Sequence, residues 1–120
     1  DWWRAAGQCG KKWIRDQAGG FGHGAELTTS VLMALESETL QQPLPSGEPP
    51  MNGLSRAQKH QFNRGDAFQA YGNFSEYCTT GAWGDLAGAS QEKGLLIINE
   101  TVEYISSTIL EFLHSSRNGI

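Results

Sequence analysis

The chain has 120 residues and a mass of 13.1 kDa, the size of one domain or of one piece of a larger domain. Nine Lys and Arg against thirteen Asp and Glu leave a net charge of −4, which argues against a nucleic-acid-binding protein because such proteins present a basic face. No apolar run approaches the roughly 20 residues of a membrane helix, and the first residues lack the pattern of a signal peptide. We therefore expect neither nucleic acid nor a membrane as a partner.

The chain is poor in charged residues and in cysteines, and both features predict something about its surroundings. Charged residues make up 18% of the sequence, below the usual share of about 25%, so we expect part of the surface to be buried against a partner. Cys9 and Cys78 are too few for a disulfide framework. We expect two reduced thiols and a cytoplasmic protein, with a single bridge as the alternative.

Two segments in the first third of the chain have the spacing of amphipathic helices. Residues 1–16 form the first, in which one face carries Trp2, Ala6, Cys9 and Trp13. A glycine-rich break over residues 18–24 separates it from a second helix predicted over residues 25–40. The apolar residues predicted to form the buried side of that helix are Leu27, Val31, Ala34 and Leu35.

The strongest helical pattern lies near the end of the chain. Ser90 is a suitable N-cap and Glu92 lies in the favourable first turn. After them, apolar residues recur at steps of three and four, which predicts a long helix with one apolar face. That face consists of Leu95, Ile98, Val102, Ile105, Ile109 and Phe112. We expect residues 115–120 to be a frayed tail.

The segments between these helices contain little regular structure. Residues 41–73 hold all four prolines and form a long excursion, residues 74–83 are a candidate short strand, and residues 81–85 form a tight turn. Three amphipathic helices need a surface to cover, yet no buried strand is evident. One explanation is an unrelated all-α domain. We favour helices that cover a sheet whose strands lie outside this chain.

The best candidate site lies where the glycine-rich break enters the second predicted helix. His23 and Glu26 place an imidazole and a carboxylate three residues apart, so Glu26 could orient His23 or hold a water. The hydroxyl of Thr28 and of its neighbours could cap the helix or donate to a substrate oxygen. One His and one Glu are too few ligands for a metal, so we expect no metal site within this chain. The alternative is a glycine-rich turn with a capping carboxylate and no catalysis.

Three segments resemble the creatininase family of metal-dependent amidohydrolases. Residues 23–35 (HGAELTTSVLMAL) are similar to the family segment His-(Ala/Gly)-Gly-Glu-x-Glu-Thr-Ser followed by apolar residues. Residues 1–3 resemble a Tyr-Trp pair that follows a central strand. Residues 81–85 and 89–94 resemble a Gly-x-x-Gly-Asp-Pro…Ala-(Ser/Thr)-x-Glu-Lys-Gly signature. These motifs occur in the family order and leave only residues 41–73 unmatched.

The resemblance implies an α/β fold, a three-layer α/β/α sandwich in which residues 1–120 are the helix-rich C-terminal half of one domain. It implies a hydrolase that uses metal-activated water to cleave an amide C–N bond, cyclic amides included, or a C–C bond of a cyclic ketone. Two divalent ions, Zn or Mn, would be held mostly by the N-terminal half, and the assembly would be a homo-hexamer. By similarity, His23 and Glu26 are the catalytic residues, while Trp3 and Thr28 contact the substrate.

The sequence departs from the family pattern at positions that bear on activity. Thr28 occupies the place of the family's second Glu, and a hydroxyl cannot serve as a carboxylate base. Residues 19–22 replace a Trp or acidic residue of creatinine-cleaving members, so creatinine itself is not the expected substrate. These departures leave a second hypothesis open, a non-catalytic assembly or binding subunit of a creatininase-like complex.

Overall fold

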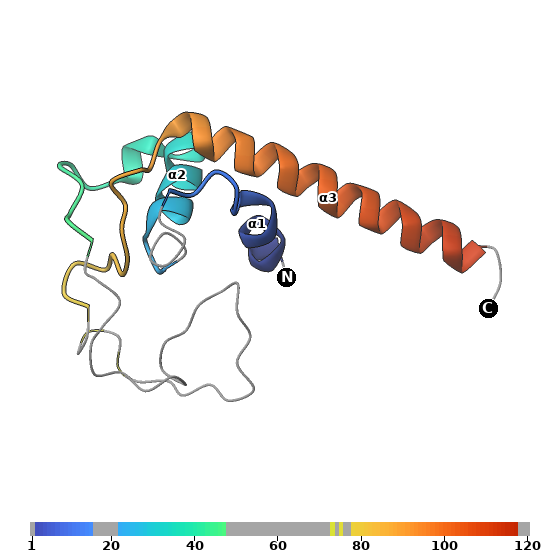
Figure 1. Cartoon of the computed structure of the whole chain (residues 1–120), viewed down its shortest axis with the longest axis horizontal. Helices are drawn as coiled ribbons and strands as arrows, with labels where there is room; N and C mark the ends of the chain where they lie inside the picture. Colours follow the sequence, from blue (N-terminus) through green and yellow to red (C-terminus); the bar gives the residue numbers. More distant parts are fainter. Residues whose placement is uncertain (1, 16–21, 48–72, 74, 76–77, 118–120) are drawn as a thin grey trace.

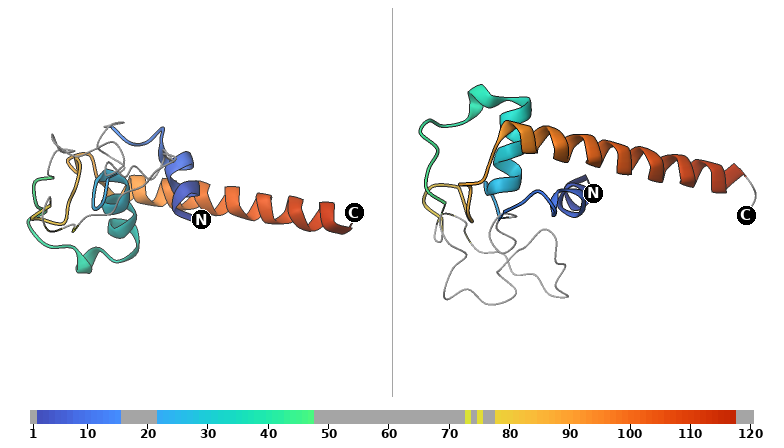
Figure 2. Two further views of the ribbon diagram at one scale, coloured as in Figure 1. Left: turned by 90° about the horizontal axis from the view of Figure 1, so that it is seen from below. Right: turned by 45° about the horizontal axis from the view of Figure 1, so that its top comes forward.

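The computed structural model describes residues 2–15, 22–47, 73, 75 and 78–117 (Figure 1). These residues form three α-helices, α1 (Trp2–Gly10), α2 (Glu26–Leu35) and α3 (Gln91–Arg117), and a 3₁₀ turn, η1 (Ser37–Thr39). Helix α3 packs against both α1 and α2 through its N-terminal part, and its C-terminal part extends beyond them (Figures 1 and 2). The described part of the chain contains no β-strand, so the predicted three-layer α/β/α sandwich is not seen among these residues.

Helix α1 is shorter than predicted, because it ends at Gly10 instead of continuing to residue 16. A Cβ at Gly10 would lie 3.0 Å from Leu27 Cδ1 and 3.3 Å from Ile97 Cγ1, so the chain passes close to the core there. The Trp13 N–H donates to the Gly10 carbonyl at 2.9 Å and closes a turn. Trp13 therefore lies beyond the helix, and its spacing from Trp2 does not place the two on one face.

The two tryptophans have different environments as a result. Trp2 is 57% exposed, so it is not buried together with Ala6 of the face predicted for residues 1–16. Trp13 is half-buried and packs against the core cluster. Trp3 lies in α1, but its side chain is outside the described residues, as is most of the predicted glycine-rich break.

Helix α2 begins one residue after its predicted start and ends at Leu35, five residues before its predicted end. The backbone of Glu36 leaves the helical region, at φ −146° and ψ 56°, while its N–H still donates to the Leu32 carbonyl. The chain then turns through η1. Leu27 is 1% exposed as predicted, whereas Leu35 at the helix end is 63% exposed and does not belong to the buried side.

The start of α3 confirms the predicted cap, since the Lys93 N–H donates to the Ser90 Oγ at 3.2 Å. Its end differs from the prediction, because residues 115–117 continue the helix instead of fraying. The hydroxyls of Ser115 and Ser116 both donate to the Phe112 carbonyl, at 2.9 and 2.8 Å. Arg117 in the last turn also complements the negative end of the helix dipole.

The core lies where the three helices meet and consists of Ala6, Ile14, Leu27 and Ile97, with Trp13 and Val31 packed against it. Ile97 is 0% exposed and lies beside the apolar face predicted for α3, not on it. Of that predicted face, Ile98 and Ile105 are half-buried, whereas Val102, Ile109 and Phe112 are 58%, 52% and 69% exposed. Within the described structure, much of the apolar face predicted for α3 therefore has no cover.

Other predictions have mixed outcomes. The candidate strand over residues 74–83 is wrong for the residues described there, 75 and 78–83, which include bends and a single β-bridge residue, Trp83, but no strand. Cys9 and Cys78 are both free thiols, as predicted. No helix in the described ranges is long and apolar enough to span a membrane.

Candidate functional site

His23 lies in the loop that leads into α2 and is held against the turn at residues 81–83. Its Nδ1 is 2.8 Å from the Gly81 carbonyl oxygen, and its own carbonyl accepts the Trp83 N–H at 2.6 Å. Gly24 makes this close approach possible: its φ is +66°, and a Cβ there would lie 2.8 Å from the same Gly81 oxygen. The loop before α2 and the turn before α3 therefore meet at His23.

The contact with Gly81 decides which ring nitrogen of His23 carries the proton. A carbonyl oxygen can only accept a hydrogen bond, so Nδ1 must be the donor. In the neutral ring this leaves Nε2 with the lone pair, and in the charged ring both nitrogens carry protons. The residue is exposed, so the ring lies at the surface where the loop enters α2.

Glu26, the other predicted catalytic residue, is the first residue of α2 and is 0% exposed. Its Oε1 forms an ion pair with the Lys93 ammonium, and its Oε2 accepts the backbone N–H of Arg15 at 2.9 Å. A Cβ at Gly88 would lie 2.7 Å from the carboxylate carbon, so the backbone of residue 88 covers this group as well. The carboxylate of Glu26 is thus enclosed by the chain itself.

Lys93, in the first turns of α3, completes this arrangement. Its Nζ also donates to the Gly88 carbonyl at 2.7 Å, and its side chain is 26% exposed. The ammonium therefore links α2, the segment before α3, and α3 itself. A buried carboxylate needs such a partner, because an unpaired charge in the interior is strongly destabilising.

A second ion pair lies at the edge of this region. Arg15 Nη2 is 3.2 Å from Asp85 Oδ2, and the Asp85 carbonyl accepts the Glu26 N–H at 2.9 Å. The pKa of Asp85 is lowered, chiefly because the Ala87 N–H donates to its Oδ1 at 2.9 Å and then because of the nearby Arg15. Asp85 thus fixes the turn before α3 through its own backbone and side chain.

Thr28, predicted to contact substrate, is half-buried on α2. Its hydroxyl donates to the Ala25 carbonyl at 3.1 Å, so in this structure it bonds to the residue just before its own helix. Thr29 behaves similarly and donates to the Gly24 carbonyl at 2.8 Å. The side chain of Trp3 is not among those described, so its predicted substrate contact stays a prediction.

The described residues do not fit a metal ion. No group of three or more His, Cys, Asp and Glu side chains comes together among them. The carboxylate of Glu26 is already engaged by Lys93 and by the backbone of Arg15. A metal centre in this protein would need ligands from outside the described part of the chain.

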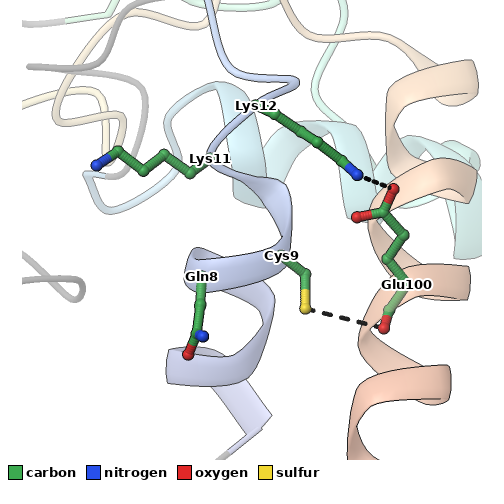
Figure 3. A pocket seen from close by; sticks show the side chains of 5 residues that line it. All are labelled: Gln8, Cys9, Lys11, Lys12 and Glu100. Carbon is green, nitrogen blue, oxygen red and sulfur yellow. Dashed lines mark hydrogen bonds and ion pairs between the residues drawn. The ribbon is translucent and has the colours of Figure 1, made fainter.

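A separate hollow of about 600 Å³ lies between α1 and α3 and is lined by Gln8, Cys9, Lys11, Lys12 and Glu100 (Figure 3). Lys12 pairs with Glu100 at 2.7 Å, and Cys9 lies 3.8 Å from the Glu100 carbonyl, whereas Lys11 points away. The Trp13 indole N–H also donates to the Glu100 carboxylate at 3.2 Å. These contacts fasten α1 to α3, and no residue of the predicted site lines this hollow.

Sequence reasoning missed the residues that enclose Glu26. No role was predicted for Arg15, although its backbone N–H reaches Glu26. Lys93 lies in the Glu-Lys-Gly part of the family signature, and that motif was the one available signal. Nothing in the spacing of residues predicts that positions 67 apart form an ion pair.

Comparison with known families agrees with the motifs. The family profile described as "Creatininase: Creatinine amidohydrolase" matches residues 1–109. This match covers most of the chain, so the chain belongs to the creatininase family. No curated protein and no solved structure matches it. Members of the family are hydrolases that are generally metal-dependent, and membership implies an α/β fold for the domain as a whole.

Proposed function

We propose that this chain is the C-terminal half of a creatininase-type hydrolase, which cleaves an amide C–N bond, cyclic amides included, or a C–C bond of a cyclic ketone. The observation that supports the proposal is the way in which the His23 ring is held. Its Nδ1 is committed to the Gly81 carbonyl at 2.8 Å, and the residue is exposed at the entrance to α2. In its charged form, with a proton on each ring nitrogen, an imidazole oriented in this way can donate the Nε2 proton to a departing nitrogen and keep the Nδ1 proton on the Gly81 carbonyl.

The rest of the domain would supply what the described residues lack. The uncovered apolar face of α3, with Phe112 69% exposed and Ile109 52% exposed, supports a sheet that packs against it and completes an α/β/α sandwich. We propose that this sheet and the ligands for two divalent ions, zinc or manganese, belong to the N-terminal half. Cytoplasmic location and a hexameric assembly are further parts of the proposal.

The test uses the complete protein with its metals and a panel of linear amides, cyclic amides and cyclic ketones. We expect His23→Ala to lower kcat by about 100-fold or more, as for loss of a general acid. Glu103→Ala, on the exposed side of α3, is the matched control and should leave turnover unchanged. Turnover of His23→Ala within twofold of the parent would remove His23 from the mechanism.

A second candidate function rests on Thr28. Because its hydroxyl bonds to the Ala25 carbonyl and cannot act as a carboxylate base, the chain could serve as a non-catalytic assembly or binding subunit. In that case the complete protein would bind no divalent metal in elemental analysis and would turn over none of the panel. Stoichiometric metal together with turnover would rule this candidate out.

A further inference from the structure

We infer that Lys93 and Glu26 act together as positioning residues for His23, and that Glu26 does not contact the substrate. The inference rests on the proposed function, since it concerns how the proposed catalytic histidine is held. Lys93 thereby has a role that the sequence did not predict, and Glu26 is a positioning residue instead of a catalytic one.

The Glu26 carboxylate is enclosed by the chain. Both of its oxygens are engaged, Oε1 by the Lys93 ammonium and Oε2 by the Arg15 N–H at 2.9 Å. The side chain is 0% exposed, and the backbone at Gly88 leaves no room beside it. A substrate atom or a water could reach this carboxylate only if one of these groups moved away.

The ion pair between Glu26 and Lys93 connects the start of α2 to the segment that precedes α3. Glu26 begins α2 only three residues after His23, and its N–H donates to the Asp85 carbonyl at 2.9 Å. Lys93 holds the other side, because its Nζ donates to the Gly88 carbonyl at 2.7 Å as well as to Glu26. The ion pair therefore clamps the start of α2 to the segment between residues 85 and 93.

The same two segments determine how the His23 ring is oriented. Gly81 and Trp83, which precede the clamped segment, hold the histidine ring and backbone at 2.8 and 2.6 Å. If the start of α2 shifts relative to this segment, the Gly81 oxygen no longer faces Nδ1. The ring would then lose the contact that keeps the proton on Nδ1.

The test compares Lys93→Met, Glu26→Gln and the double variant in the complete protein. Lys93→Met leaves a buried carboxylate without its ammonium partner, so it could fail to fold. In the double variant the new amide at position 26 can still accept the Arg15 N–H and donate to the Gly88 carbonyl. Lys12→Met is the matched control, because it removes an exposed lysine whose partner, Glu100, lies further along α3 and outside the candidate site.

The decisive measurement is the ¹⁵N NMR signature of the His23 imidazole, which reports the tautomer and does not depend on turnover. We expect Nδ1–H in the parent and in Lys12→Met, and a mixture of tautomers in Glu26→Gln and, if it folds, in Lys93→Met. The double variant should return toward Nδ1–H and recover at least tenfold in kcat over Glu26→Gln, with KM within about twofold throughout.

Two results would overturn the inference. One is an unchanged His23 tautomer in folded Glu26→Gln. The other is a double variant that shows the His23 signature of the parent but is as inactive as Glu26→Gln. Such a result would mean that the Glu26 carboxylate takes part in catalysis itself. If His23→Ala retains full turnover, the proposed catalytic role of His23 fails, but the NMR comparison still decides whether the ion pair positions the ring. If the complete protein turns over none of the panel, the proposed function fails, and the NMR comparison is unaffected.

Discussion

Helices α2 and α3 approach each other closely at Gly94, and this crossing gives a sharp prediction for Gly94→Ala. A Cβ at this position would overlap the Ser30 carbonyl oxygen and would lie 2.9 Å from the Ala34 Cβ. The Ser30 Oγ also accepts the Ser90 N–H at 3.2 Å just before α3 begins, so Ser30 is tied to α3 there. A backbone oxygen and a methyl group cannot rotate aside, so the two helices would have to separate.

Two opposing effects determine the magnitude. Alanine is a better helix former than glycine by about 1 kcal/mol, which favours the variant. Overpacking a tight contact costs roughly 1–3 kcal/mol, and a clash with backbone belongs at the upper end, about 3 kcal/mol. We therefore expect Gly94→Ala to lower the free energy of unfolding by about 2 kcal/mol despite its better helix propensity.

Urea unfolding of the complete protein, followed by circular dichroism, measures this change. Ser107→Ala is the control, because Ser107 is exposed on the same helix and its hydroxyl bonds to the Tyr104 carbonyl one turn back. It should be neutral or stabilising by about 0.5 kcal/mol. A Gly94→Ala protein as stable as the parent would show that α2 and α3 do not approach each other at this glycine.

Two further predictions concern the core and the turn before α3. Ile97→Ala should lower the free energy of unfolding by about 2–5 kcal/mol, because Ile97 is 0% exposed and packs against Leu27; an unchanged Tm would contradict the observed core. The pKa of Asp85 is depressed in the folded state by the Ala87 N–H and by Arg15. The ionised carboxylate therefore contributes to stability above its ordinary pKa of 3.8, and this contribution is lost as the pH falls through the lower pKa of the folded state. In Asp85→Asn the free energy of unfolding should fall less between about pH 4 and pH 2 than in the parent, and the same decrease in both proteins would refute this.

The long helix α3 shows what local periodicity can predict. Steps of three and four residues from Leu95 onward indicated a helix, and Ser90 indicated where it begins; both are confirmed. Periodicity also found a strongly apolar face. It did not say that Ile97, beside that face, would contact α1 and α2, because the choice of contact face depends on the helices that pack against it.

The ends of the helices were harder to predict, since they depend on contacts between distant segments. Helix α1 ends at Gly10 because the chain there passes within contact distance of Leu27 and Ile97. The end of α3 involves local contacts instead, since the helix includes Ser115 and Ser116, whose hydroxyls donate to the Phe112 carbonyl three and four residues back. Glycine is common at helix ends, so Gly10 was a signal for the end of α1, but the helical spacing that continues to Trp13 favoured a longer helix.

The family motif around His23 and Glu26 was recognisable from the residues alone, and membership in the creatininase family is confirmed. The sequence by itself therefore determined the family, the existence of the three helices and the residues to inspect, because motifs and helical periods are properties of neighbouring residues. Only the tertiary structure decided how those residues are used. The contacts of His23 with Gly81 and of Glu26 with Lys93 join positions 58 and 67 residues apart, and such pairings follow from how the helices pack.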